Sequence, residues 1–261
     1  MLATPFMLSL SKHAAPAVLL LCLMLPGCSP TADSIDAHLQ RANELLRHGQ
    51  TGPAESEVEA AIRSDPSRAE TYRAAIGIYW GHKRPRQAAA AADELLRRAG
   101  SGRLDERLST SEKARLLLML GQLRQESGDL VEAERAYRDA LALQPDHPQF
   151  LNALAYLYAD EGFRLGIALR LARRAVAHAP SDGAIVDTLG WAQYRLGQYD
   201  AAMRTLKKAV EFMPDDATLR YHLGAAYAKK GLKPEARIEL EKSLLLDSSM
   251  SDAIKLRKTI H

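Results

Sequence analysis

The chain has 261 residues, of which 43 are Ala and 40 are Leu, whereas Val and Ile together number only 15. Ala and Leu favour helices and β-branched residues favour strands, so this composition excludes a β-rich fold. A hydrophobic content of 47% with only 12 Pro and 16 Gly also excludes a disordered or collagen-like chain. The formal net charge is +3 and the basic residues are scattered, so nucleic acid is not an expected partner.

The N-terminal segment carries an uncharged apolar run over residues 14–27, preceded by Lys12. A basic residue followed by a short apolar run is typical of a secretory signal peptide. A membrane-spanning helix needs about 20 apolar residues, and this run is shorter and ends in Pro26-Gly27. We expect residues 1–27 to be a signal peptide and residues 28–34 a short flexible tether, with an uncleaved membrane anchor as the alternative.

Both cysteines, Cys22 and Cys28, lie in the first 28 residues, so the body of the chain holds no disulfide framework. The run Leu25-Pro26-Gly27-Cys28 resembles the lipobox of bacterial lipoproteins, from which only Pro26 departs. The resemblance implies cleavage before Cys28 and acylation of its thiol. Ser29 stands where the family places Asp for retention in the inner membrane, so an outer-membrane lipoprotein facing the periplasm is implied. The alternative is a secreted periplasmic protein in which Cys28 is incidental.

A period of 34 residues organises the rest of the chain. In the clearest copy Leu189-Gly190 is followed by Gly197 and closed by Pro214, and Leu223-Gly224 with Gly231 recurs 34 residues later. Four well-matched copies occupy residues 114–249, and two degenerate copies occupy residues 35–98. Small residues let two helices approach closely, Gly suits the turn between them, and Pro ends the second helix.

These residues closely resemble the tetratricopeptide repeat, a helix-turn-helix unit of 34 residues. The resemblance implies an all-α fold, a right-handed superhelical α-solenoid of about six repeats. Residues 250–261 are amphipathic and are expected to form a capping helix over the last repeat.

Two features interrupt the repeat pattern. Lys83 stands where the turn of the second repeat would have Gly. Residues 99–109 add an insertion, which is either a loop or an extended helix end. The run Ser109-Thr110-Ser111-Glu112 is a capping-box pattern, which predicts that a new helix begins there.

Motifs for chemistry are missing from the sequence. No GxSxG, GxxxxGK[ST], GxGxxG or HExxH pattern occurs, and the eight His residues are dispersed without metal-ligand spacing. We therefore predict no catalytic residue, no metal, no cofactor and no small-molecule substrate.

Aromatic residues point to a binding surface in the last repeats. Positions two, five, nine and twelve of each first helix are spaced by three or four residues and form one stripe. The family resemblance implies that this stripe lines a concave groove that binds extended or helical peptides. The predicted site comprises Asn152, Tyr156, Asp187, Trp191, Tyr194, Arg195 and Tyr221. The alternative is that these rings only pack between helices.

The favoured function is a non-catalytic adaptor, anchored through acylated Cys28, that binds other envelope proteins. The C-terminal third also resembles tetratricopeptide lipoproteins of exopolysaccharide export and exosortase-type protein sorting. Three alternatives stay open in the same setting: a type IV pilus or secretin assembly lipoprotein, an adaptor for peptidoglycan enzymes, and a structural spacer. A glycan-processing enzyme is the remaining hypothesis, and it would need convergent carboxylates.

Overall fold

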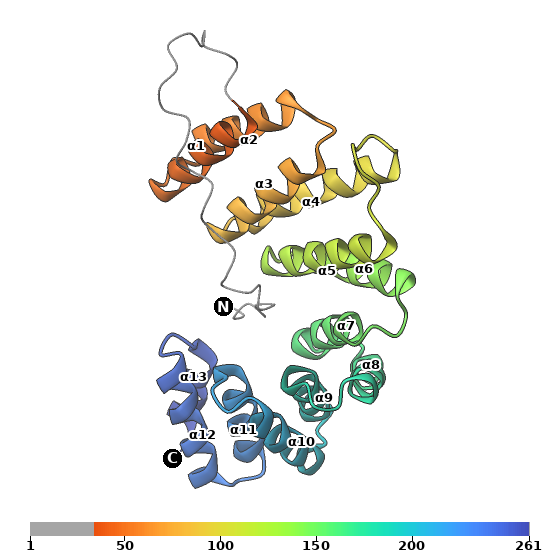
Figure 1. The fold of residues 1–261 in the computed structure, drawn as a ribbon. Helices are drawn as coiled ribbons and strands as arrows, with labels where there is room; N and C mark the ends of the chain where they lie inside the picture. The colour runs from red at the N-terminus through yellow and green to blue at the C-terminus, as the bar shows by residue number, and fades with distance from the viewer. Residues whose placement is uncertain (1–33, 261) are drawn as a thin grey trace, which may run out of the picture. The chain divides into compact units, whose positions relative to one another are not determined.

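The computed structural model describes residues 34–260, which form thirteen α-helices and no strand (Figure 1). The helices are α1 (Ile35–Arg47), α2 (Thr51–Ser64), α3 (Ala69–Gly81), α4 (Pro85–Gly100), α5 (Thr110–Glu126), α6 (Leu130–Leu143), α7 (Pro148–Glu161), α8 (Leu165–His178), α9 (Gly183–Arg195), α10 (Tyr199–Phe212), α11 (Ala217–Lys229), α12 (Lys233–Leu246) and α13 (Ser251–Thr259). The first twelve pack as six consecutive pairs and α13 packs on α12. This confirms the predicted all-α repeat array with a final additional helix.

The described residues divide into two compact units. The N-terminal unit contains α1 to α4 and the segment that follows them to Arg107, and the C-terminal unit runs from Leu108 to Ile260. The predicted signal peptide and Cys28 lie outside the described residues, as does nearly all of the predicted tether. No helix of residues 34–260 combines the length and the apolar character that a membrane span requires.

In the pairs α9/α10 and α11/α12 the two helices approach closely where the first helix has a Gly. A Cβ atom added to Gly190 of α9 would lie 2.6 Å from Leu206 Cγ of α10, and one added to Gly224 of α11 would lie 2.9 Å from Leu240 Cγ of α12. Both leucines are fully buried. The small residue in the first helix therefore sets the distance between the paired helices, as the repeat pattern predicts.

The turns between paired helices use the left-handed backbone region. Gly128, Gly197 and Gly231 have φ values of +83°, +76° and +75° in the turns of three C-terminal pairs. Lys83 takes the equivalent place between α3 and α4 with φ +57°. Placing a residue with a Cβ atom in this backbone region costs about 1 kcal/mol. The turn between α3 and α4 therefore keeps the same shape, but at some cost in stability.

Side chains cap the first helices of several pairs. Ser109 forms the predicted capping box, because its Oγ accepts from the Glu112 N–H at 3.2 Å while its own N–H donates to Glu112 Oε2 at 2.7 Å. Asp182 and Asp216, one repeat apart, cap α9 and α11 through hydrogen bonds from backbone N–H groups. These caps satisfy donors that the first helical turn leaves unpaired.

The predicted insertion forms an irregular segment after α4 and folds back on α3. Asp105 Oδ1 accepts from the Ala69 N–H at 3.1 Å, and the Asp105 N–H donates to the Ser67 carbonyl at 2.9 Å. Glu106 forms an ion pair with Arg73 of α3. The segment thus supplies the N-terminal cap that α3 does not have in its own Arg68.

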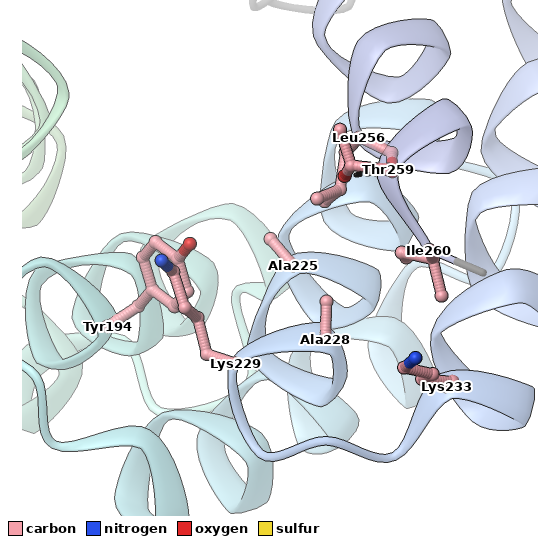
Figure 2. A pocket seen from close by; sticks show the side chains of 8 residues that line it. All are labelled: Tyr194, Ala225, Ala228, Lys229, Lys233, Leu256, Thr259 and Ile260. Carbon is pink, nitrogen blue, oxygen red and sulfur yellow. Dashed lines mark hydrogen bonds between the residues drawn. The ribbon is translucent and has the colours of Figure 1, made fainter.

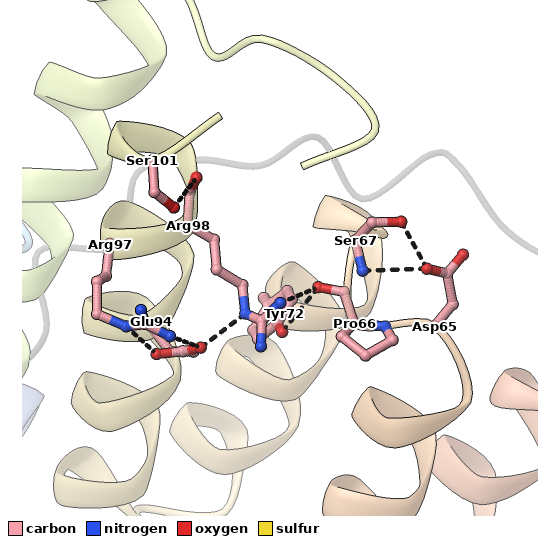
Figure 3. A network of polar contacts seen from close by, with 8 residues as sticks. All are labelled: Asp65, Pro66, Ser67, Tyr72, Glu94, Arg97, Arg98 and Ser101. Carbon is pink, nitrogen blue, oxygen red and sulfur yellow. Dashed lines mark hydrogen bonds and ion pairs between the residues drawn. The ribbon is translucent and has the colours of Figure 1, made fainter. Parts of the chain in front are cut away.

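A polar network joins the first two repeats at the turn before α3 (Figure 3). Arg98 of α4 donates to the Pro66 carbonyl at 2.8 Å and to Glu94 Oε1 at 2.6 Å. The Tyr72 hydroxyl donates to the same Pro66 carbonyl at 3.1 Å, and the Arg98 guanidinium lies 5.7 Å from the centre of the Tyr72 ring. The network fixes the end of the first repeat against both helices of the second.

Gly190→Ala is expected to lower the free energy of unfolding by about 1 to 3 kcal/mol, because the new methyl group would overlap Leu206. The matched control is Gly166→Ala in α8, where the nearest neighbour of a Cβ atom is Arg170 Nη1 at 4.0 Å. That control is expected to raise stability by up to about 1 kcal/mol through helix propensity. Denaturant unfolding followed by circular dichroism measures both, and equal effects would contradict the assigned close approach.

Candidate functional site

The residues of the predicted groove come from the first helices of three consecutive pairs. Asn152 and Tyr156 lie on α7, Asp187, Trp191, Tyr194 and Arg195 lie on α9, and Tyr221 lies on α11. The four aromatic side chains of this set pack in one cluster. We call Tyr156, Trp191, Tyr194, Tyr221 and the neighbouring His222 the aromatic face.

Trp191 occupies the centre of the aromatic face. Its ring stacks on His222 with centroids 4.0 Å apart and planes at 14°, and on Tyr194 at 4.7 Å and 7°. Tyr221 lies 6.1 Å away at a tilted angle. Because Trp191 is only 6% exposed while Tyr156, Tyr194 and Tyr221 are each partly exposed, the indole supports the tyrosines that meet solvent.

His222 of the aromatic face also forms a buried acid–base pair with Asp187. Asp187 of α9 is 3% exposed and His222 of α11 is 2% exposed, and His222 Nδ1 lies 2.8 Å and 3.0 Å from the two carboxylate oxygens. The pair joins two consecutive repeats. A buried carboxylate without a partner is costly, so His222 stabilises Asp187 where solvent does not reach it.

His222 is the residue that the sequence-based prediction missed. It directly follows Tyr221 and lies 35 residues after Asp187. A buried carboxylate needs a hydrogen-bonding neighbour, and His222, one residue beyond the position that lies a full repeat after Asp187, is a basic residue of the next repeat close to that position. That requirement is the signal by which the pair could have been found.

Two polar atoms near the face have no hydrogen-bond partner within the described part of the chain. They are Asn152 Oδ1 and Trp191 Nε1, an acceptor and a donor, and both are buried. A buried polar group left unpaired costs about 1 to 3 kcal/mol. A bound molecule or water that supplied the partner groups would recover that cost.

Arg195 ties α9 to the end of α7. Its guanidinium donates to the Asp160 carbonyl and lies 5.8 Å from the centre of the Trp191 ring. A cation over an indole and a hydrogen bond to a late helical carbonyl both favour this position. Arg195 therefore belongs to the framework of the aromatic face and also lies half-buried at its edge.

The tyrosine hydroxyls of the face remain protonated at neutral pH. Burial raises the pKa of Tyr221 to about 12 and also raises the pKa of Tyr156 and of Tyr194. These groups are therefore neutral hydrogen-bond donors and acceptors, which suits contacts to peptide groups.

A small cavity adjoins the aromatic face at Tyr194 (Figure 2). Its volume is about 190 Å³, and it lies between α9, α11, α12 and α13. The lining residues are Tyr194, Ala225, Ala228, Lys229, Lys233, Leu256, Thr259 and Ile260. Within residues 34–260, no group of three or more His, Cys, Asp or Glu side chains is placed to hold a metal ion.

Three family models match successive parts of the chain. Two described as tetratricopeptide repeat match residues 39–103 and 114–157, and one described as TPR repeat matches residues 190–231. These matches fall in both units: the first runs from α1 through α4, the second from α5 into α7, and the third from α9 through α11. The chain is a tetratricopeptide repeat protein. Proteins of this kind are generally non-catalytic scaffolds for protein interactions.

Similar proteins agree with this assignment. The TPR repeat-containing protein PA4667 of Pseudomonas aeruginosa is 32% identical over 196 residues, which cover 75% of this chain and 31% of the relative. The BBSome complex member bbs-4 of Caenorhabditis elegans is 25% identical over 143 residues, or 52% of this chain and 29% of that protein. This tetratricopeptide repeat chain thus spans about a third of the length of the curated relatives it matches.

Solved structures share the fold at low identity. A tetratricopeptide repeat protein of Parabacteroides merdae is 18% identical with a TM-score of 0.65, covering 87% of this chain and 85% of its own. YrrB, described as a TPR protein with an unusual peptide-binding site, is 20% identical with a TM-score of 0.50, covering 77% of this chain and 97% of its own.

His222→Ala is expected to destabilise this tetratricopeptide repeat protein by about 3 kcal/mol, because it leaves the buried Asp187 carboxylate unpaired. Asp187→Ala should have a similar effect, and the double variant should lose less than the sum, which denaturant unfolding would measure. The control His178→Ala removes a half-exposed His that lies 3.8 Å from Asp146, and it should change stability by less than about 0.5 kcal/mol. Additive effects of the Asp187 and His222 variants would contradict the pairing.

Proposed function

We propose that the aromatic face of the C-terminal unit binds a peptide segment of a protein partner. The observation that carries this proposal is the gathering of four aromatic rings from α7, α9 and α11 in one cluster. Aromatic anchors dominate the energy of protein interfaces because they bury a large area with little loss of side-chain freedom.

The division between buried and accessible rings assigns different roles within the face. Tyr194 and Tyr221 are partly exposed and offer both ring surface and a protonated hydroxyl to a ligand. Trp191 and Asp187 are almost fully buried and hold those tyrosines in position through stacking and through His222. Such packing restricts the contact residues before binding, which reduces the entropy cost of association.

The accessible hydroxyl groups of the face suit a peptide ligand. The protonated hydroxyls of Tyr194 and Tyr221 can each donate and accept a hydrogen bond. A peptide backbone carries complementary carbonyl and N–H groups in every residue. YrrB, a protein of similar fold, is described as having an unusual peptide-binding site.

Peptides selected by phage display against the full chain should lose at least about tenfold in affinity for the double variant Tyr194→Ala/Tyr221→Ala, because two anchor rings are removed. Phe212→Ala is the matched control, since Phe212 is a 39% exposed aromatic residue at the end of α10 and is not part of the face. Circular dichroism checks that the variants are folded. Failure to select any peptide, or equal affinity for the double variant and the control, would overturn the proposal.

We also propose that this scaffold is anchored to the bacterial cell envelope through acylated Cys28, facing the periplasm, where it recruits other envelope proteins. The support is the apolar run of residues 14–27 that ends at a lipobox-like Cys28. More than one acyl chain gives a stable anchor, whereas a single chain binds membranes only marginally. Service in exopolysaccharide export or surface-protein sorting is proposed from the resemblance of the C-terminal third alone.

Cys28→Ala should abolish incorporation of an alkyne-labelled fatty acid when the full chain is produced in a Gram-negative bacterium, because it removes the acylated thiol. Cys22→Ala is the matched control and should keep the label, since Cys22 lies within the segment expected to be removed. In-gel detection of the alkyne after cell fractionation measures both. Label that persists in Cys28→Ala, or no label in the unaltered chain, would refute the anchor.

A further inference from the structure

We propose that the outer side of the second helices in the C-terminal unit docks on a membrane surface that contains anionic phospholipids. Basic side chains recur there at the same two places of α6, α8 and α10. We call the following six residues the basic surface: Arg135, Arg138, Arg170, Arg173, Arg204 and Lys207. None of them belongs to the aromatic face, so the inference goes beyond the proposed binding of a peptide.

The repeat places these six residues on one side of their helices. In each of the three helices the basic residues are the sixth and the ninth, and residues three apart share a side of a helix. The fourth, eighth and eleventh residues of the same helices are at most 1% exposed, and in α8 these are Ala168, Ala172 and Ala175. With about 3.6 residues per turn, the basic and the buried sets lie on opposite sides. The basic residues therefore point away from the paired first helices.

The three helices are neighbours within the unit. Val176 of α8 packs against the cluster that contains Val210 of α10. Val176 also packs, together with Leu141 of α6, against the cluster that contains Ala175. Basic residues that are scattered along the sequence therefore gather on one side of three adjoining helices.

The positive charge of the basic surface is largely uncompensated on α8 and α10. All six side chains are exposed, and within residues 34–260 the basic residues of α8 and α10 that belong to this surface form no ion pair. The helix α8 contains no carboxylate. On α10 Asp200 is paired with Lys230 at 2.7 Å, and Glu211 is the other carboxylate. On α6 the two arginines lie 3.8 Å and 3.5 Å from Glu132 and Glu134.

The chemistry of the basic surface suits phosphate groups. Five of its six residues are Arg, whose planar guanidinium group matches two oxygens of one phosphate. An anionic leaflet attracts basic segments that lie near it. Its lipids diffuse, so their phosphates can adjust to the fixed spacing of the helices. A folded acidic protein would instead need carboxylates at matching positions.

Exposed apolar side chains border the basic surface at α6 and at α12. Val131 lies four residues before Arg135 and is 80% exposed. Ile238 is 50% exposed and is the sixth residue of α12, the place that Arg holds in the other three helices; Leu245, seven residues later, is 86% exposed. Protein interfaces have apolar centres and polar rims, which is the reverse of this order. A membrane surface accommodates both kinds of side chain, because apolar groups enter the headgroup region while cations contact phosphates.

The test measures partition of the full chain carrying Cys28→Ala, so that no acyl chain on this residue contributes. The vesicles contain phosphatidylcholine alone or with about 30 mol% phosphatidylglycerol. Sedimentation in about 0.1 M salt should give a partition coefficient at least about tenfold higher for the anionic vesicles, since each basic residue near such a leaflet adds roughly fivefold. About 0.5 M salt should remove most of this difference. Partition into neutral vesicles measures the contribution of the apolar run of residues 14–27.

Two double variants locate the binding. Arg170→Glu/Arg173→Glu should abolish the preference for anionic vesicles, because attraction becomes repulsion at the centre of the basic surface. Arg257→Glu/Lys258→Glu is the matched control, since it makes the same charge change at two exposed positions of α13, and it should keep most of the preference. Circular dichroism checks that both variants are folded.

A third double variant tests the apolar border. Ile238→Ser/Leu245→Ser should lower partition into the anionic vesicles about fivefold, because two exposed apolar side chains no longer enter the headgroup region. The net charge is unchanged, so salt should affect this variant as it affects the parent chain.

Equal partition into the two kinds of vesicle, or equal effects of the α8 and α13 variants, would overturn the inference. Tighter binding of labelled polyglutamate or duplex DNA than of anionic vesicles would also overturn it, and would assign the basic surface to an acidic protein or to nucleic acid. The proposed function is tested separately, because the phage-selected peptides report on the aromatic face and the fatty-acid label reports on Cys28. Failure of the vesicle test would therefore leave both of those proposals standing.

Discussion

The close approach of two helices at a small residue is the constraint on which the rest of this structure depends. Gly190 lies against Leu206 and Gly224 lies against Leu240, so neither first helix has room for a β-carbon at the crossing. That contact fixes these two helix pairs, and neighbouring pairs stack through the faces that remain. The stacking brings α7, α9 and α11 together, and only for that reason do residues distant in sequence, such as Tyr156 and Tyr221, share one cluster.

The aromatic face departs from a purely structural core in its polar content. A packed interior would be expected to contain aliphatic groups or fully paired polar groups. Here Asp187 and His222 are paired, while Trp191 Nε1 and Asn152 Oδ1 are left without partners among the described residues. Leaving these two groups unpaired costs about 1 to 3 kcal/mol each and lowers the stability of this region.

Much of the fold was predictable from sequence because its determinants are local or strictly periodic. Gly190 and Gly224 recur with the repeat. Ser109 and Glu112 predict the start of a helix from four consecutive residues. Helical periodicity places Tyr156, Trp191 and Tyr221 on the same side of their own helices, and the 34-residue repeat aligns those helices. The remaining contacts join residues in different repeats and depend on side-chain direction. Examples are the hydrogen bond from Arg195 to the Asp160 carbonyl and the one from the Ala69 N–H to Asp105. No pattern within a single repeat predicts either contact.

The buried pair of Asp187 and His222 has a consequence for how such an array changes over evolutionary time. Repeats joined only by apolar contacts tolerate insertion or loss of a unit, because any neighbour with a similar surface closes the gap. The junction between α9 and α11 is different, since each half carries a buried polar group that only the other half satisfies. Removal or insertion of a repeat there would leave a buried carboxylate or imidazole without its hydrogen-bond partner. These two repeats are therefore expected to be inherited as one indivisible block, whatever the number of repeats around them.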